Sequence, residues 1–243
     1  MSTGTGSHIS RQFEHELEDI RNKVMAMGGL IEKQLEQAIT SLLESDSALA
    51  EEVIKTDNTV NNMELEIDEE CTQILARRQP TASDLRLVIT VIKTINDLER
   101  IGDETKRIAR MALDLMDKDV GKSRLQAMKH LGEHVKSVLH NILDAFARMD
   151  TTEAYKIYRQ DKQVDVEYEG TLRQTITFMM EDPRSIPWAL NIIWIARALE
   201  RIGDRATNIS EYIIYFVKGK DVRHTGLEGI KETIKEDLVS VSE

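Results

Sequence analysis

The sequence of 243 residues has few of the residues that mark β-rich or disulfide-linked proteins. It contains three prolines, and aromatic residues make up 5% of the chain. Folds rich in β-strands need more turn residues and more aromatic or β-branched side chains than this. The single cysteine, Cys71, permits neither an intrachain disulfide nor a thiolate metal site. We therefore expect an all-α protein of a reducing compartment, the cytoplasm.

Long apolar runs and basic patches are also missing. No stretch approaches the roughly 18 uninterrupted apolar residues of a membrane span. The first residues, MSTGTGSHIS, lack the basic and apolar segments of a secretory signal. The formal net charge of −11 argues against a nucleic-acid partner, because binding phosphates requires a concentrated basic face. An acidic chain suits metal cations or a basic protein surface as partners.

What the sequence contains instead is long amphipathic helices. From Phe13 onward, apolar residues recur at steps of three and four, which is the spacing of one face of a helix. Asp46 and the segment around Asp150 supply N-caps, and Thr81 or Ser83 can cap the helix that follows Pro80. The pattern predicts six helices, which end near Ser45, Arg78, Asp117, Met149, Met180 and Lys218.

The chain is an internal repeat. LERIGD stands at Leu98–Asp103 and again at Leu199–Asp204, and DNTVNNME, from position 57, aligns with DKQVDVEY, from position 161. Two side-by-side bundles or one six-helix array fit this plan. We predict two tandem three-helix bundles, in residues 10–119 and 121–220. A polar C-terminal tail, residues 221–243, either forms a short helix or stays loose.

The repeated motif places two carboxylates on one helix face. Glu99 and Asp103 are one turn apart, and so are Glu200 and Asp204. Like charges at this spacing weaken a helix by a few tenths of a kcal/mol unless a cation lies between them. A hard metal ion with oxygen ligands would do so. The alternative is a solvated ion-pair face, with Arg107 completing a ladder, but such a face needs no identical repetition.

The two copies differ in the turn that follows the motif. Arg107 follows the first copy and could disfavour a cation there, whereas Asn208 follows the second and could add a ligand oxygen. If only one copy binds metal, the sequence favours the second. Further carboxylates on the preceding helices either complete the clusters or are simply solvated; these are Asp57, Asp161 and Asp165.

Other residues of the motif helices are explained by packing. Gly102 and Gly203 each cost about 1 kcal/mol relative to alanine in a helix interior. Close helix packing explains them, and room beside the carboxylates is the alternative. We expect Met179–Met180, Trp188 and Trp194 to lie in the core.

Signatures of enzymes are absent from the sequence. There is no P-loop, no G-x-S-x-G and no C-x-x-C, and none of the six histidines has the E-x-x-H spacing of ferritin-like di-iron bundles. A metalloenzyme with a carboxylate-bridged centre remains an alternative, which would need an open coordination position and an acid–base group. A structural helical adaptor is a further alternative.

These motifs together resemble the PhoU family of phosphate-transport accessory and regulatory proteins. The resemblance rests on LERIGDETKRIA, LERIGDRATNISE, ILARRQPTASDLRLV and FMMEDPRSIPWAL, and it covers roughly residues 10–226. It implies a non-enzymatic, commonly dimeric protein that negatively regulates the phosphate-starvation (Pho) response. It further implies an adaptor between the nucleotide-binding subunit of the phosphate ABC importer and the sensor histidine kinase, reaching the membrane only through partners.

The resemblance also implies metal ions on the repeated motif: iron, zinc, manganese or magnesium. By position, the ligands are Glu99, Asp103, Glu200 and Asp204. A departure between the copies, Asp97 against Ala198, puts equal occupancy in doubt. We hypothesise that the acidic stripes of two parallel motif helices form a docking face for a basic partner. The residues expected to contact it are Glu99, Arg100, Asp103, Glu200, Arg201 and Asp204.

Overall fold

Eight α-helices form the computed structural model, which describes residues 5–118, 120–121 and 125–240 and contains no strand among them. The long helices are α1 (Thr5–Glu44), α2 (Ser47–Arg78), α3 (Ala82–Met116), α4 (Gln126–Arg148), α5 (Thr151–Glu181) and α6 (Ile186–Lys218). The all-α class and the six helix ends are confirmed. Position 119, at the predicted boundary between the repeats, lies outside the described residues. In the part of the chain described, no helix is long and apolar enough to cross a membrane.

Aspartates begin the second helix of each repeat. Asp46 accepts a hydrogen bond from the Leu49 backbone N–H at 3.0 Å, and Asp150 accepts from two backbone N–H groups of α5 at 3.0 Å. Such side-chain caps stabilise a helix by roughly 1 kcal/mol. For α3, Thr81 stands at the predicted cap position but makes no side-chain cap hydrogen bond, and Ser83 lies inside the helix. The preceding helix, α2, ends at Gln79, whose backbone is left-handed with φ 48°.

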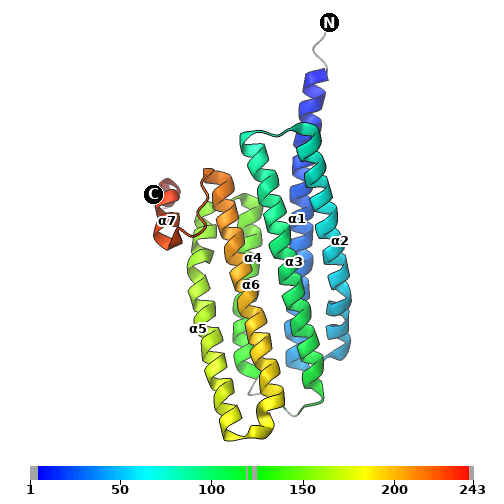
Figure 1. Ribbon diagram of the computed structural model, residues 1–243, viewed down its shortest axis with the longest axis vertical. Helices are drawn as coiled ribbons and strands as arrows, with labels where there is room; N and C mark the ends of the chain where they lie inside the picture. The colour runs from blue at the N-terminus through cyan, green and yellow to red at the C-terminus, as the bar shows by residue number, and fades with distance from the viewer. Residues whose placement is uncertain (1–4, 119, 122–124, 241–243) are drawn as a thin grey trace.

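The helices pack as two three-helix bundles, α1–α3 and α4–α6, joined mainly by α3 against α6 (Figure 1). The apolar stripe of α1 lies in the first core: Val24, Met27, Ile31 and Leu35 are fully buried, each with 0% exposure. Burial of this kind stabilises a protein by roughly 25 cal/mol per Å² of apolar surface. The predicted pair of bundles is thus present, with the motif helices at their junction.

The two motif helices run in opposite directions. Arg86 of α3 donates to the Phe216 carbonyl at 3.2 Å, whereas Glu104, further along α3, accepts from Arg201 at 3.0 Å. Residues further along α3 therefore contact residues with lower numbers on α6, and Figure 1 shows the two helices side by side and running in opposite directions. The expected parallel arrangement is wrong. The motif copies cross each other near the middle of the junction, because packing between the bundles sets the direction.

A buried polar network crosses this junction. Asp97 of α3 is 3% exposed and accepts hydrogen bonds from Arg205 at 3.2 Å, Asn208 at 3.4 Å and Tyr212 at 2.8 Å. Burial, followed by the charge of Asp97 and the hydrogen bond to it, raises the pKa of Tyr212. The second repeat has Ala198 at the position of Asp97, so this network has no counterpart built on that position.

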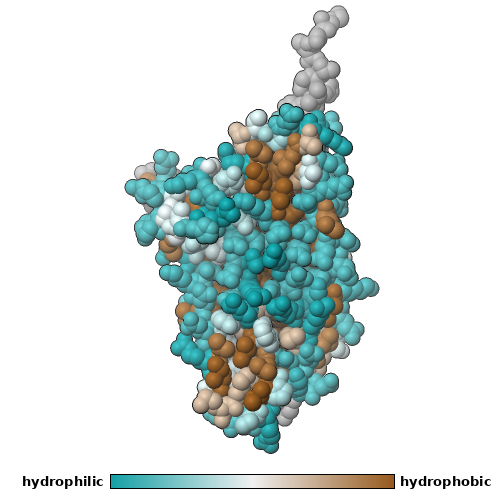
Figure 2. All heavy atoms as spheres, in the orientation of Figure 1, coloured by the Kyte–Doolittle hydropathy of each residue, from teal (hydrophilic) through white to brown (hydrophobic). Residues whose placement is uncertain are grey.

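An apolar surface lies where α5 ends and α6 begins (Figure 2). Trp188 is 6% exposed, as expected, but Trp194 is 52% and Met180 80% exposed, so the prediction that they lie in the core is wrong. No described element of the chain covers this end of the two helices. The surface, called the α5–α6 apolar patch below, comprises Ile176, Met180, Ile186, Leu190 and Trp194.

The C-terminal tail is largely helical and packs on α5. Its helices are α7 (Gly226–Thr233) and α8 (Lys235–Ser240), and Ile230 and Ile234 are fully buried. Asp237 accepts from Lys218 at 2.6 Å and from Thr151 at 2.5 Å. The short helix that the sequence allowed is therefore present as α7.

Candidate metal centre

Three carboxylates of the second repeat converge on one point. Asp165 of α5 and Glu200 and Asp204 of α6 each offer an oxygen, and these oxygens all lie within 4.8 Å of one another. Glu200 and Asp204 share a face because they are one helical turn apart. Close packing of α5 against α6 adds Asp165. We call these three residues the second acidic cluster.

Glu200 is the buried member of this cluster. The residue is 8% exposed; its Oε1 is paired with Arg197 of the same helix, while its Oε2 is buried without a hydrogen-bond partner. Burial, followed by the charge of Asp204, raises the pKa of Glu200 to about 7. A buried carboxylate oxygen without a partner is unfavourable by roughly 1–3 kcal/mol or more. A cation between the carboxylates would remove that cost.

Asp161 borders the cluster from α5. It accepts a hydrogen bond from the Thr207 hydroxyl at 3.1 Å, yet burial raises its pKa more than this bond lowers it. Burial, followed by the charges of Asp161 and Asp165, also raises the pKa of Asp204. The donor set consists of hard carboxylate oxygens, which suits magnesium, manganese or iron and is also accepted by zinc. The residues present therefore fit the metal ions that the family resemblance implies.

Two other predicted residues of the second repeat point across the junction. The amide nitrogen of Asn208 is directed to Asp97, and the guanidinium of Arg201 is paired with Glu104 at 3.0 Å. Asn208 thus takes part in the network that joins α3 and α6. Arg201, with 42% of its side chain exposed, keeps enough surface to meet a partner.

The first repeat holds a lysine among its carboxylates. Lys106 Nζ lies 2.6 Å from Asp57 Oδ2 and 3.0 Å from Asp103 Oδ1. Asp57 is 2% exposed, and Glu99 is half-buried with a pKa raised by burial and then by the charges of Asp103 and Glu64. We call Asp57, Glu99 and Asp103 the first acidic cluster. Its internal cation is Lys106.

The arginines near the first motif pair with residues outside the first acidic cluster. Arg107 is paired with Glu104 at 3.2 Å, so the expected ladder from Asp103 to Arg107 is wrong. Arg100 is exposed and donates to Asn96 at 3.1 Å. Sequence reasoning attributed the difference between the copies to Arg107 and missed Lys106. The sequence does contain this difference between the copies, because Lys106 follows Asp103 by three positions and Thr207 follows Asp204 by three positions.

The motif glycines lie where neighbouring helices touch. A β-carbon added at Gly102 would lie 3.3 Å from Val60 Cγ1, and one at Gly203 would lie 3.3 Å from Val164 Cγ1. Both distances are tight, so close packing explains the two glycines. At Gly102 the added carbon would also lie 3.8 Å from Asp57 Oδ1, so the small residue leaves room beside that carboxylate as well.

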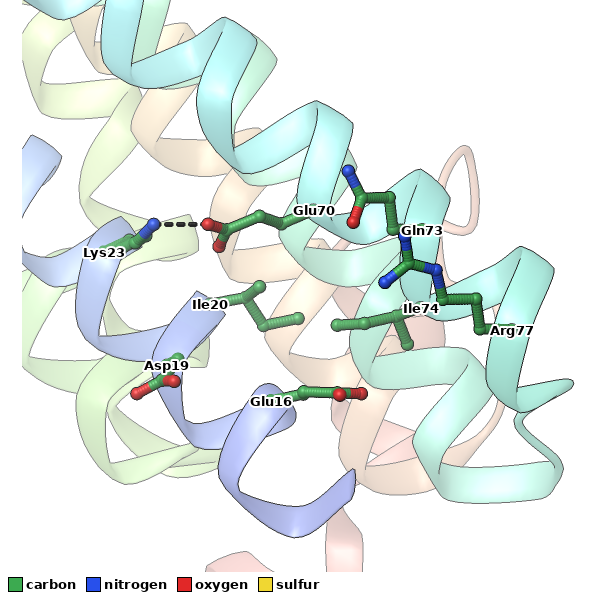
Figure 3. A pocket seen from close by; sticks show the side chains of 8 residues that line it. All are labelled: Glu16, Asp19, Ile20, Lys23, Glu70, Gln73, Ile74 and Arg77. Carbon is green, nitrogen blue, oxygen red and sulfur yellow. Dashed lines mark hydrogen bonds and ion pairs between the residues drawn. The ribbon is translucent and has the colours of Figure 1, made fainter. Parts of the chain in front are cut away.

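A separate hollow between α1 and α2 has the character of an ion-paired surface (Figure 3). Figure 3 shows Lys23 directed to Glu70, with Ile20 and Ile74 between the helices. Glu16, on its rim, is paired with Arg78 at 2.5 Å. Since these charges are already neutralised by neighbours, we assign the hollow no ligand.

Known proteins are similar to this chain in sequence along most of its length. The family model described as the PhoU domain matches residues 24–112 and again 128–213. The phosphate-specific transport system accessory protein PhoU of Escherichia coli K12 is 54% identical over 225 residues, which are 93% of each chain. Its homolog from Pseudomonas aeruginosa is 51% identical over 228 residues, 94% of each chain.

Solved structures of PhoU proteins are similar to this chain in fold. The crystal structure of PhoU from Pseudomonas aeruginosa is similar with a TM-score of 0.83 at 50% identity, covering 86% of this chain and 100% of that one. The phosphate transport system regulatory protein PhoU from Streptococcus pneumoniae gives a TM-score of 0.80 at 30% identity, covering 86% of this chain and 99% of that one. Two matched domains, nearly full-length relatives and the common fold together show that the chain belongs to the PhoU family.

Proposed function

We propose that this protein regulates phosphate uptake and represses the phosphate-starvation (Pho) response. It acts in the cytoplasm as an adaptor between the nucleotide-binding subunit of the phosphate ABC importer and the sensor histidine kinase. The observation that carries the proposal is the 54% identity, along 93% of both chains, to the Escherichia coli accessory protein of phosphate-specific transport. The description of the Streptococcus pneumoniae relative as a regulatory protein supports the regulatory part.

The mechanism is binding rather than catalysis. A hydrophilic band crosses the middle of the face shown in Figure 2, where α3 and α6 carry the two motif copies. The exposed carboxylates of the two motif copies, Asp103 and Asp204, suit a basic partner surface, since complementary charge accelerates and orients docking. For docking to regulate the kinase, the protein must bind one signalling state more tightly than the other. Glu99, Arg100 and Arg201 complete the proposed docking face, whereas Glu200, with 8% exposure, is too buried to be a main contact for a partner.

The second acidic cluster is the proposed site of a divalent cation. The unpartnered Glu200 Oε2 and the convergence of Asp165 and Asp204 support it. Bound there, a divalent ion would balance the charge and hold α5 against α6. The docking face would then depend on the ion, because Asp204 belongs to both.

The regulatory function is tested in a bacterium that lacks its own copy of the gene. Expression of this chain should restore repression of a phosphate-controlled reporter in phosphate-rich medium. A reporter that stays fully active, although the protein is present at normal levels, would refute the proposal. Pull-down of the kinase and of the importer subunit, with and without Mn²⁺, identifies which contact is made.

Replacing Glu200 and Asp204 by alanine should lower the affinity for Mn²⁺ by at least about tenfold, because two direct ligands are lost. Isothermal titration calorimetry measures this. The matched control is Glu14→Ala with Glu18→Ala, which removes two exposed carboxylates at the same helical spacing on α1. Equal loss in the control, or none in the cluster variant, would remove the second acidic cluster from the proposal. Kinase binding unchanged in both metal conditions would remove it from docking.

The α5–α6 apolar patch supports a homodimer. Five exposed apolar side chains at one end of two helices form a patch of the kind that marks protein interfaces. Leu190→Glu together with Trp194→Glu should shift the protein from dimer to monomer in sedimentation-velocity experiments. Leu65→Glu, at another exposed apolar residue (66%), is the control and should leave the dimer intact. A variant that remains dimeric at micromolar concentration would place the interface elsewhere.

A further inference from the structure

The internal repeat gives two versions of one acidic cluster with different residues at one position. Lys106 follows Asp103 by three residues, and Thr207 follows Asp204 by three. Lys106 reaches Asp57 of α2, whereas Thr207 reaches Asp161, the counterpart of Asp57 on α5. The same geometric position therefore holds an ammonium group in the first repeat and a neutral hydroxyl in the second.

The ammonium of Lys106 makes the contacts that a bound cation would make. It joins carboxylates of two helices, with 2.6 Å to Asp57 Oδ2 on α2 and 3.0 Å to Asp103 Oδ1 on α3. Its side chain is 19% exposed, and that of Asp57 is 3% exposed. An ion pair this sheltered is weakly screened by salt. A divalent ion in the same place would have to displace the lysine.

We propose that Lys106 is the built-in cation of the first acidic cluster, so that the chain takes a divalent ion only at the second. This inference rests on the cation site proposed above. It assigns the asymmetry of the repeat to Lys106 and Thr207. Arg107 and Asn208 do not produce it, since Arg107 pairs with Glu104 of its own helix and Asn208 donates to Asp97 across the junction.

Arg197 is not an equivalent cation in the second cluster. It pairs with Glu200 from the preceding turn of the same helix and leaves Glu200 Oε2 buried without a partner. Within the described residues, no lysine or arginine forms an ion pair that joins Asp161 or Asp165 of α5 to Asp204 of α6. Among the described residues, the carboxylates of α5 and α6 are thus not joined by a side-chain cation, whereas Lys106 joins those of α2 and α3.

The test exchanges the two residues. Lys106→Thr should raise the number of Mn²⁺ ions bound per chain by about one, measured by calorimetry and by elemental analysis after gel filtration. In the presence of a chelator, the melting temperature of this variant should be about 5 °C lower than that of wild type, because the buried carboxylate of Asp57 has lost its partner. Addition of Mn²⁺ should bring the melting temperature back to the wild-type value. Thr207→Lys should remove the ion that wild type binds, and it decides the question independently if Lys106→Thr fails to fold.

The outcomes separate the two proposals. The ion bound by wild type tests the second acidic cluster, and the difference between the variants and wild type tests the role of Lys106. If folded Lys106→Thr gains no ion and Mn²⁺ does not restore its melting temperature, Lys106 is only a structural ion pair and the inference is wrong. Two ions bound by wild type would also overturn it.

Discussion

Asp97→Ala should lower the free energy of unfolding by about 3 kcal/mol, which corresponds to a fall of roughly 6–12 °C in melting temperature. Asp97 is 3% exposed and is the shared acceptor of Arg205, Asn208 and Tyr212. The variant removes the charged acceptor of two partly buried neutral donors, Asn208 and Tyr212, and a hydrogen bond to a charged group contributes roughly 1.5–3 kcal/mol. The side chain of Arg205 is 33% exposed and can regain water, so the full cost of an isolated buried charge does not apply.

Conservative and distant variants sharpen this prediction. Asp97→Asn keeps an acceptor for Tyr212 but loses the charge, so we expect about half of the loss. Asp114→Ala changes an exposed residue on the same helix and should stay within about 0.5 kcal/mol of wild type. Urea unfolding measures all three. If Asp97→Ala and Asp114→Ala unfold alike, the network contributes nothing to the junction.

The prediction concerns assembly of the repeat as well as stability. Since Asp97 links α3 to α6, its loss should weaken the contact between the bundles more than either bundle core. Hydrogen exchange should then increase first along the facing sides of α3 and α6. Uniform acceleration over all six long helices would mean that the bundles unfold together.

The helices could be predicted because their signals are local. The apolar stripe from Val24 to Leu35 and the aspartate caps at Asp46 and Asp150 each depend on residues within a few turns. The motif glycines were likewise correctly assigned to close packing. Relative direction is not local, so no pattern in the sequence indicated that α3 and α6 are antiparallel.

The site could be predicted only in part, for the same reason. Glu200 and Asp204 share a face by helical spacing alone, and Asp165 was among the carboxylates of the preceding helix that were expected to complete a cluster or to be solvated. Which cation enters the first cluster depends on side-chain reach, and Lys106 reaches across to α2 whereas Arg107 turns to Glu104. Sequence position favoured Arg107 because it lies one turn after Asp103.

The periodicity of the apolar residues also could not predict which of them are exposed. Trp188 and Trp194 both lie on an apolar helix, but one is buried and the other is half exposed. A hydrophobic stripe does not reveal whether its partner is the same chain or another molecule. The error at Trp194 therefore pointed to the α5–α6 apolar patch.

Gly203→Leu should destabilise the protein by about 2–3 kcal/mol, because the first added carbon already lies 3.3 Å from Val164 Cγ1. The gain in helix propensity, about 1 kcal/mol, offsets only part of this strain. Gly203→Ala should be nearly neutral, since the same gain opposes a smaller displacement. Thermal and urea unfolding measure both variants.

The glycine also connects packing to the proposed metal centre. Asp165 follows Val164 on α5, so a larger residue at position 203 that pushes α5 away should separate Asp165 from Glu200 and Asp204. Gly203→Leu should therefore lower Mn²⁺ affinity as well as stability. Gly170→Ala is the control, because an added carbon there meets nothing within 4 Å; it should stabilise α5 by about 1 kcal/mol and leave Mn²⁺ affinity unchanged. If Gly203→Leu binds Mn²⁺ as tightly as wild type, the close approach of α5 and α6 serves packing alone.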